Sequence, residues 1–395
     1  MPERVGFGHH SQRIKVFTMS HVNFLLTSLD DIATLVKHLP ETDAKSQAAA
    51  RARQDCLTKP AGSLGRLEDL AVFFAGWQAV EVPRIAHAQA VVFAGNHGVC
   101  AQNVNPFPQE VTAQMVLNFR AGGAAINQLC QVNGADLSVV DLDLDKPTAD
   151  FTAAPAMTAA ESLAALNAGA AAVSPDASVL ILGEMGIGNS TVGAALATAS
   201  FGGEAADWVG RGTGSDDAGV QRKVDAINRA VSRHSATIGD GCAVLTALGG
   251  REQAAICGAV LAARLWRIPV ILDGFICTAS VAPLYTLDPA CLDHCLVGHL
   301  SAEPGHKRLL DAMVRGSACL GYRPFGVGVP RGNGNLRASW RGRRVMLRRR
   351  LAEARLAMLL LSRIPAGRIG DPIPAIGASA WAWPLVGAVI AAPAA

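Results

Sequence analysis

The run from Val179 to Thr191 reads VLILGEMGIGNST, and it decides the fold class of this 395-residue chain. It opens with four apolar residues, which is typical of a strand buried in a parallel sheet. Three glycines and several polar residues follow, and the chain then enters an Ala-rich stretch that favours a helix. A strand, a glycine-rich turn and a helix in this order predict one repeating unit of an α/β fold.

The same pattern recurs along the chain. Short apolar runs at residues 88–94, 137–142 and 269–272 each end in polar or glycine-rich residues, with Ala-rich stretches between several of them. We therefore predict a doubly wound α/β fold, in which helices flank a parallel sheet. Because such sheets bind ligands at the carboxyl ends of their strands, we expect the polar loops to gather there. Helical spacing also predicts helices over residues 23–58 and 67–80.

Composition and charge exclude several classes of protein. Half of the residues are apolar and 17% are charged, which excludes a disordered or coiled-coil chain. The net charge of +3 is unevenly spread, because residues 312–352 hold ten arginines and no acid or lysine. The rest of the chain has 25 basic against 32 acidic residues, so the basic segment is no argument for a nucleic-acid partner. Nine cysteines without a secretory signal predict free thiols in the cytoplasm.

Two features suggest further sites, and both have simpler explanations. Cys291, His294, Cys295 and His299 carry metal-binding side chains, but their spacing matches no standard zinc pattern. Core packing is therefore the favoured interpretation, and no metal is predicted. Residues 372–395 carry no charge and are long enough to span a bilayer. Their prolines and small side chains make a poor span, so we expect membrane contact only if this segment is genuine.

The glycine-rich turns are candidate phosphate sites. In Gly183–Thr191, glycines and free N–H groups at a helix start would bind phosphate, although the spacing is neither a Walker nor a dinucleotide motif. A second cluster, GRGTG at Gly210–Gly214, would bind phosphate together with Lys223. A plain tight turn or a solvated loop is the alternative in each case. The third candidate is the run Ser301–His306, which leads into a helix.

Three polar side chains near these turns are candidates for binding or catalysis. Gln109, with the apolar groups beside it, would hold a flat heterocycle. His97 is equally well explained as a hydrogen-bonded histidine of the core. Glu184 lies where a strand meets the glycine-rich turn, so it would orient or deprotonate a ring nitrogen. Its alternative role is structural, as a carboxylate near a helix N-terminus.

Together these strings resemble the nicotinate-nucleotide:dimethylbenzimidazole phosphoribosyltransferases of cobalamin biosynthesis. The resemblance is collinear over roughly residues 19–313. It rests on KPAGSLGRLED from Lys59, NHGV from Asn96, PQEVTAQM from Pro108, GGAAIN from Gly122, GEMGIGNST from Gly183, GRGTG from Gly210, GGREQAAI from Gly249, PVILDGFI from Pro269 and GHLSAEPGH from Gly298.

The resemblance implies a fold, a reaction and an assembly. The fold is a Rossmann-like parallel sheet flanked by helices, with a smaller helical domain formed from the two chain ends. The reaction moves phosphoribose from nicotinate mononucleotide to 5,6-dimethylbenzimidazole, which gives α-ribazole 5′-phosphate and nicotinate. The implied protein is a cytoplasmic homodimer that uses no cofactor and no metal.

The resemblance also implies roles for single residues. Ser301, Lys223 and the turn from Gly186 to Gly188 would hold the phosphate region, and Asp273 would bind the ribose. Three other residues would lie near the benzimidazole: Ser63, Gln109 and Met185. The expected substrate-binding residues are in full Ser63, Gln109, Met185, Gly186, Ile187, Gly188, Asn189, Gly210, Arg211, Gly212, Thr213, Gly214, Lys223, Asp273 and Ser301.

The resemblance ends after residue 313. The family's general base is a glutamate in a Gly-Glu-Gly-Ser/Thr-Gly motif near the C-terminus, and this sequence contains no such motif. We interpret residues 314–345 as out-of-frame translation, a hypothesis that reading the DNA in all three frames would test. The tail from Met346 resembles the start of cobalamin synthase, an integral membrane protein. We therefore expect weak or no transferase activity, with Glu184 as the candidate substitute base.

These observations predict a domain organisation and leave alternatives open. An inactive homologue that binds substrate, or a membrane-tethered fusion of two pathway proteins, would share the same motifs. A third alternative, an NAD-dependent oxidoreductase, is supported by the sheet pattern alone, because the sequence lacks a suitable glycine fingerprint. Met19 is as good a start as Met1. The expected units are an extension at 1–18, a transferase domain at 19–313 (helical over 19–85, α/β over 86–313), an Arg-rich segment at 314–345 and an apolar tail at 346–395.

Overall fold

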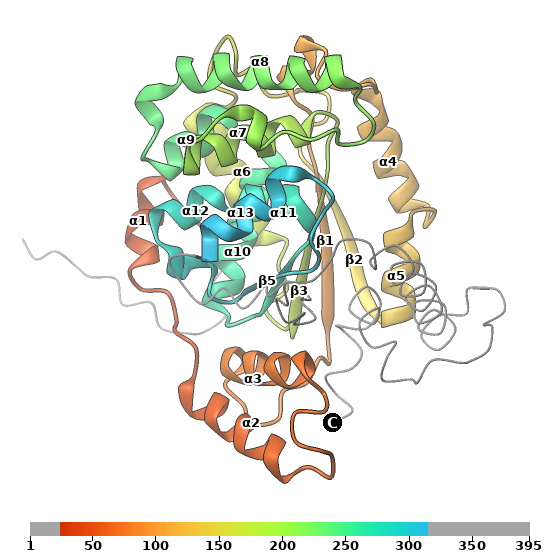
Figure 1. Ribbon diagram of the computed structural model, residues 1–395, viewed down its shortest axis with the longest axis vertical. Coiled ribbons are helices and arrows are strands. Elements are labelled where there is room, and N and C mark those ends of the chain that lie inside the picture. The colour runs from red at the N-terminus through yellow and green to blue at the C-terminus, as the bar shows by residue number, and fades with distance from the viewer. Residues whose placement is uncertain (1–23, 315–395) are drawn as a thin grey trace, which may run out of the picture.

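A computed structural model describes residues 24–314 and has a parallel sheet at its centre (Figure 1). The order of the strands across the sheet is β2-β1-β3-β4-β5, and every neighbouring pair is parallel. The predicted α/β fold is therefore confirmed. The strands are β1 Ala88–Ala94, β2 Ala135–Asp141, β3 Val179–Met185, β4 Val270–Leu272 and β5 Cys295–Val297.

The central strands follow the apolar runs, with differences of one to three residues at the ends of β2, β3 and β4. β1 has the predicted bounds, because β2 and β3 pair with it along its whole length. β3 runs three residues beyond the predicted end at Leu182, since Gly183, Glu184 and Met185 still pair with β1. The sequence did not predict β5, whose three residues are too short for a recognisable apolar run.

Helices cover both faces of the sheet, and α10 is the most deeply buried of them. All side chains from Arg251 to Arg264 are buried, and α6 packs directly against this helix. Cβ atoms added at Gly169 or Gly258 would overlap backbone carbonyls of the facing helix, so only glycine permits this approach. The helices are α1 Asp30–Val36, α2 Ala44–Cys56, α3 Arg66–Gln78, α4 Glu110–Arg120, α5 Ala125–Asn133, α6 Ala159–Ala171, α7 Asn189–Phe201, α8 Asp217–Arg233, α9 Gly241–Leu248, α10 Arg251–Leu265, α11 Gly274–Ser280, α12 Ala282–Leu287 and α13 Pro304–Val314.

The two edges of the sheet are covered differently. In Figure 1, α2 and α3 lie at the bottom, whereas α7, α8 and α9 lie at the top. Phe73 and Trp77 of α3 pack in one apolar cluster with Ala88 and Val179, which are the first residues of β1 and β3. Helix α3 therefore covers the amino-terminal edge, and the loops that follow the strands occupy the opposite, carboxyl-terminal edge.

Several predicted segments lie outside the described residues. They are the extension at 1–18, nearly all of the Arg-rich segment at 314–345 and the tail at 346–395 with its candidate membrane segment. Within residues 24–314, no helix combines the length and the apolar character that crossing a bilayer requires.

Candidate active site

The strand order places a topological switch point between β1 and β3, where doubly wound sheets have their ligand-binding crevice. The chain leaves β1 for β2 on one side and leaves β3 for β4 on the other, so the loops after β1 and β3 diverge. Ligands of doubly wound sheets bind at such a switch point, outside the carboxyl ends of the strands. The two strands stay joined up to this point, because Gly95 N donates a hydrogen bond to Met185 O at 3.0 Å.

The turn after β3 is a tight backbone structure that only glycine permits. Gly188 has φ +96° and immediately precedes α7, and a Cβ there would lie 2.8 Å from Cys100 Sγ. A Cβ at Gly186 would lie 2.6 Å from Gly95 O and 2.9 Å from His97 Nε2. Ile187 N is held by Thr112 Oγ1, to which it donates at 3.1 Å.

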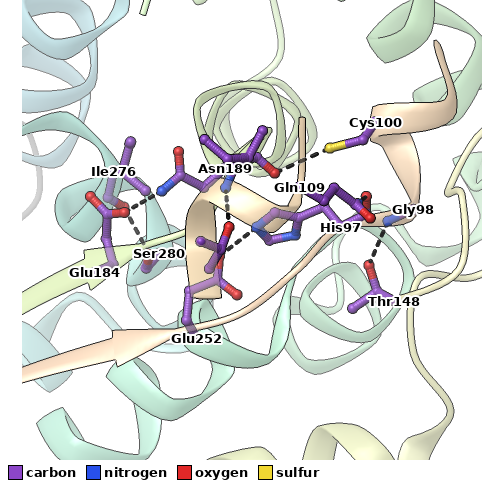
Figure 2. Close-up of polar contacts among 12 residues, drawn as sticks. His97, Gly98, Cys100, Gln109, Thr148, Glu184, Asn189, Glu252, Ile276 and Ser280 are labelled. Carbon is purple, nitrogen blue, oxygen red and sulfur yellow. Dashed lines mark hydrogen bonds and ion pairs between the residues drawn. The ribbon is translucent and has the colours of Figure 1, made fainter. Parts of the chain in front are cut away.

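Glu184 and Asn189 face each other across this turn (Figure 2). Asn189 Nδ2 donates a hydrogen bond to Glu184 Oε2. Burial of its carboxyl group, together with the nearby carboxylates of Glu252 and Asp273, raises the pKa of Glu184 to about 8. A carboxylate that binds a proton this strongly is suited to general-base chemistry near neutral pH.

A fully buried His97–Glu252 pair lies beside Glu184 (Figure 2). His97 Nε2 is 2.7 Å from Glu252 Oε1, and the two side chains are 1% and 0% exposed. Among the described residues, none makes a well-aligned hydrogen bond to the His97 nitrogens or to the Glu252 oxygens. Cβ atoms at Gly95 or Gly250 would overlap this pair, so the glycines of two loops close around it.

Sequence reasoning missed Glu252 as a member of the site. His97 was considered alone, and nothing in the spacing of residues 97 and 252 connects the two. The usable signal was Gly249-Gly250 before Arg251-Glu252, a glycine pair at the start of a helix that is buried all around. Gln109 also joins this region, because its Nε2 donates to His97 O.

The second glycine cluster meets the first through Lys223. Lys223 Nζ is buried and donates to Ser190 Oγ at 3.3 Å and to Gly210 O at 3.2 Å. Burial lowers the pKa of Lys223, while the charge of Glu303 opposes this change. Gly212 N donates to Glu303 Oε1 at 2.9 Å, which places this backbone turn beside the lysine.

The other residues of this cluster lie on the exposed side of the turn. Arg211 is paired with Asp217 and donates to Ser215 O at 3.2 Å. Thr213 and Gly214 are exposed. The structure therefore groups Lys223 with the two turns and leaves the Arg211 guanidinium at the surface.

His299 lies between Asp273 and Ser301, although sequence reasoning considered it only as a candidate metal ligand. Asp273 follows β4, and its Oδ1 lies 3.2 Å from His299 Nδ1. The Nε2 atom of the same ring is 3.4 Å from Ser301 Oγ. The hydrogen bond to Asp273 raises the pKa of His299, and burial opposes the rise. The other candidate metal ligands, Cys291, His294 and Cys295, are buried in the core.

The structure does not bring every expected residue to the carboxyl-terminal edge. Gln109 immediately precedes α4, and Met185 ends β3, so both lie near the switch point. Ser63 is exposed in the loop between α2 and α3, whose helices belong to the amino-terminal edge. Within residues 24–314, no group of three or more His, Cys, Asp or Glu side chains could hold a metal ion.

Comparisons with known proteins agree on one family. A family model described as a phosphoribosyltransferase matches residues 39–319. The nicotinate-nucleotide–dimethylbenzimidazole phosphoribosyltransferase of Rhodobacter capsulatus is 62% identical over 288 residues, which cover 73% of this chain and 86% of the relative. The protein of the same name from Roseobacter denitrificans is 57% identical over 287 residues, which cover 73% and 85%.

A solved structure gives the same result. The crystal structure of the phosphoribosyltransferase of that name from Thermus thermophilus aligns with a TM-score of 0.64 and 38% identity. The alignment covers 69% of this chain and 86% of the solved one. The chain therefore belongs to this phosphoribosyltransferase family, as its motifs predicted.

Proposed function

We propose that the chain transfers phosphoribose from nicotinate mononucleotide to 5,6-dimethylbenzimidazole at the crevice between β1 and β3. The observation that carries this proposal is the position of Glu184, a carboxyl group with a pKa of about 8, beside a glycine-rich turn and a buried lysine. The names of the relatives support this choice of substrates.

The nucleotide phosphate would bind where the turns converge. Ile187 N is already bonded to Thr112 Oγ1, so the backbone N–H groups of Gly186 and Gly188 would be the donors of this turn. The ammonium of Lys223 would add positive charge, and Ser301 would add a hydroxyl. Asp273 would accept hydrogen bonds from the ribose hydroxyls. Gln109, which precedes α4, and Met185, which ends β3 next to Glu184, would contact the benzimidazole.

The transfer requires a proton acceptor. One benzimidazole nitrogen attacks C1′ of the ribose with its lone pair, and the bond from C1′ to the nicotinate nitrogen breaks. The electron pair of that bond returns to the pyridine ring, which leaves as nicotinate. The proton on the other benzimidazole nitrogen goes to the ionised carboxylate of Glu184, which Asn189 holds in place.

The sequence lacks the family's Gly-Glu-Gly-Ser/Thr-Gly motif, and this lowers the turnover that we expect. General-base catalysis contributes about 10²–10⁴-fold, so a site that relies on a substitute carboxylate should turn over more slowly than a family member with the motif. An inactive homologue that binds both substrates is the second candidate, and the absence of the Gly-Glu-Gly-Ser/Thr-Gly motif favours it.

Homodimerisation and a cytoplasmic location remain part of this proposal. Ser63 lies at the opposite edge of its own sheet, so it can contribute only to the site of another copy of the chain. The cysteines within the described residues are free thiols, which suits a reducing compartment. Sedimentation of the full chain, with Ser63→Ala as a variant, would test the assembly.

Product analysis with the purified full chain tests the proposal. The chain is incubated with both substrates, and nicotinate and α-ribazole 5′-phosphate are quantified by chromatography with mass detection. We expect the two products in equal amounts. Calorimetric titration with each substrate distinguishes the alternatives, because binding without product supports the inactive homologue, and the absence of binding contradicts both.

A further inference from the structure

We propose that His299 sets the direction of the Ser301 hydroxyl, so that the nucleotide phosphate binds well only while His299 is protonated. The inference rests on the proposed function, because it takes Ser301 as a phosphate-binding residue. It adds a controlling residue to that site, which neither the resemblance nor the sequence pattern assigned.

The geometry begins with a ring that contacts a different partner at each nitrogen. His299 Nδ1 is 3.2 Å from Asp273 Oδ1, and Nε2 is 3.4 Å from Ser301 Oγ. An ionised carboxylate only accepts hydrogen bonds, so Nδ1 keeps its hydrogen whether the ring is neutral or charged. The protonation of His299 is therefore decided at Nε2, the atom that faces Ser301.

Ser301 Oγ already accepts one hydrogen bond, from Phe275 N at 2.9 Å. When His299 is a cation, Nε2–H donates a second hydrogen bond to the same oxygen. Both acceptor positions of the hydroxyl are then used, and its own hydrogen must point elsewhere. That free O–H is the donor that a phosphate oxygen requires.

The neutral ring reverses this arrangement. Nε2 then has a lone pair and no hydrogen, so it can only accept, and the Ser301 hydroxyl turns to donate to it. The hydroxyl then offers a phosphate no hydrogen. Loss of one proton from His299 therefore removes both a positive charge and a donor from the site.

The surroundings hold this contact in place and limit which groups can influence it. A Cβ at Gly274 would lie 2.8 Å from Ser301 Oγ and 2.9 Å from His299 Cε1, so glycine permits the close approach. Within residues 24–314, two titratable groups interact with His299: Asp273, which raises its pKa, and His306 of α13. The His299 side chain is 42% exposed, so its proton exchanges readily with solvent.

His306 cannot replace His299 as the cation. Ser301 N donates to His306 Nδ1 at 2.9 Å, so this nitrogen is an acceptor in the folded protein. Burial and the charge of His299 lower the pKa of His306 to about 4. His306 is therefore neutral throughout the range in which His299 titrates.

The sign of the pH effect follows from these roles. Affinity for the nucleotide should be high while His299 is charged, and it should fall as the pH rises through the pKa of His299. The phosphate itself gains charge above about pH 6, which would strengthen binding. A fall in affinity over this interval therefore originates in the protein.

Calorimetric titration of the full chain with nicotinate mononucleotide, from about pH 6 to about pH 9, tests the inference. In the parent chain we expect Kd to rise about tenfold over this range, the effect of one hydrogen bond to a charged partner. His299→Gln and Ser301→Ala should each flatten the profile, and any rise that remains reports the titration of Lys223 and of Glu184, whose pKa of about 8 lies in the same range. His87→Gln, which removes an exposed histidine paired with Asp136, is the matched control and should retain the parent profile.

Each outcome decides the question. If either folded variant, His299→Gln or Ser301→Ala, keeps the pH dependence of the parent, the inference is wrong, and the same holds if the nucleotide does not bind at any pH. His299→Gln and Ser301→Ala each remove one partner of the contact between His299 Nε2 and Ser301 Oγ. Either variant is therefore informative even if the other fails to fold. If the pH-dependent binding is found but no α-ribazole 5′-phosphate forms, the proposed transfer is wrong and the control of Ser301 by His299 stands.

Discussion

Replacing His97 with alanine should destabilise the fold far more than the same replacement at His87. Each of these imidazoles has a nitrogen 2.7 Å from a carboxylate oxygen, of Glu252 and Asp136 respectively. The pairs differ in burial, because the side chains of His97 and Glu252 are 1% and 0% exposed, against 47% and 76% for His87 and Asp136. The comparison therefore sets a buried histidine–carboxylate pair against an exposed one with the same separation between nitrogen and oxygen.

The magnitude follows from what remains after the imidazole is removed. His97→Ala leaves the Glu252 carboxylate buried without its partner, and the close approach of Gly95 and Gly250 leaves it little room to move toward water. Breaking a buried pair in this way costs about 3–5 kcal/mol. An exposed pair contributes about 0–1 kcal/mol, so the two variants should differ by at least about 2 kcal/mol.

Urea unfolding followed by circular dichroism measures both variants on the same scale. His97→Ala should have a much lower midpoint, and His87→Ala should unfold close to the parent chain. Combining His97→Ala with Glu252→Gln should recover part of the loss, because the uncompensated charge is then removed. A His97→Ala variant that is as stable as His87→Ala would refute the reasoning.

Further predictions concern the turn after β3 and the charged groups beside it. Glu184 accepts a proton only when ionised, and its pKa is about 8, so kcat should fall as the pH decreases below about 8. Glu184→Gln should lower kcat about 10²–10⁴-fold and remove this limb of the pH–rate profile. Asp225→Asn, which changes an exposed carboxylate, should leave both kcat and the profile unchanged. Gly188→Ala combines a positive φ with a Cβ 2.8 Å from Cys100 Sγ, so it should lower the unfolding free energy by about 1–3 kcal/mol. The loss should exceed that of Gly202→Ala, which has a positive φ but open space, and equal losses in urea titrations would contradict this account. Lys223→Met should raise the Kd for nicotinate mononucleotide measured by calorimetry, with little change in that for dimethylbenzimidazole.

Much of the fold could be predicted because its central strands are buried on both sides. β1 from Ala90 to Ala94 and the start of β3 are continuous apolar runs, and this pattern can be recognised without any tertiary information. β5 has only three residues and exists because β4 offers it a pairing edge. The extension of β3 to Met185 has the same origin, since its last residues pair with β1.

The site was predictable where glycine marks a tight turn, and hidden where distant residues meet. The turn at Gly186–Gly188 stands out in the sequence because of its glycine spacing. Glu252 and His299 carry no such mark, because their roles depend on the contacts with His97 and Ser301 that only the folded chain creates. Sequence alone likewise could not show on which edge of the sheet the loop of Ser63 lies.

The central claim is that the crevice between β1 and β3 holds both substrates of the transfer. A crystal structure of the full chain with nicotinate mononucleotide and dimethylbenzimidazole tests it most directly. The account predicts the phosphate within hydrogen-bonding distance of Lys223 Nζ and Ser301 Oγ, and a benzimidazole nitrogen beside the Glu184 carboxylate. Substrates bound anywhere other than this carboxyl-terminal edge would contradict it.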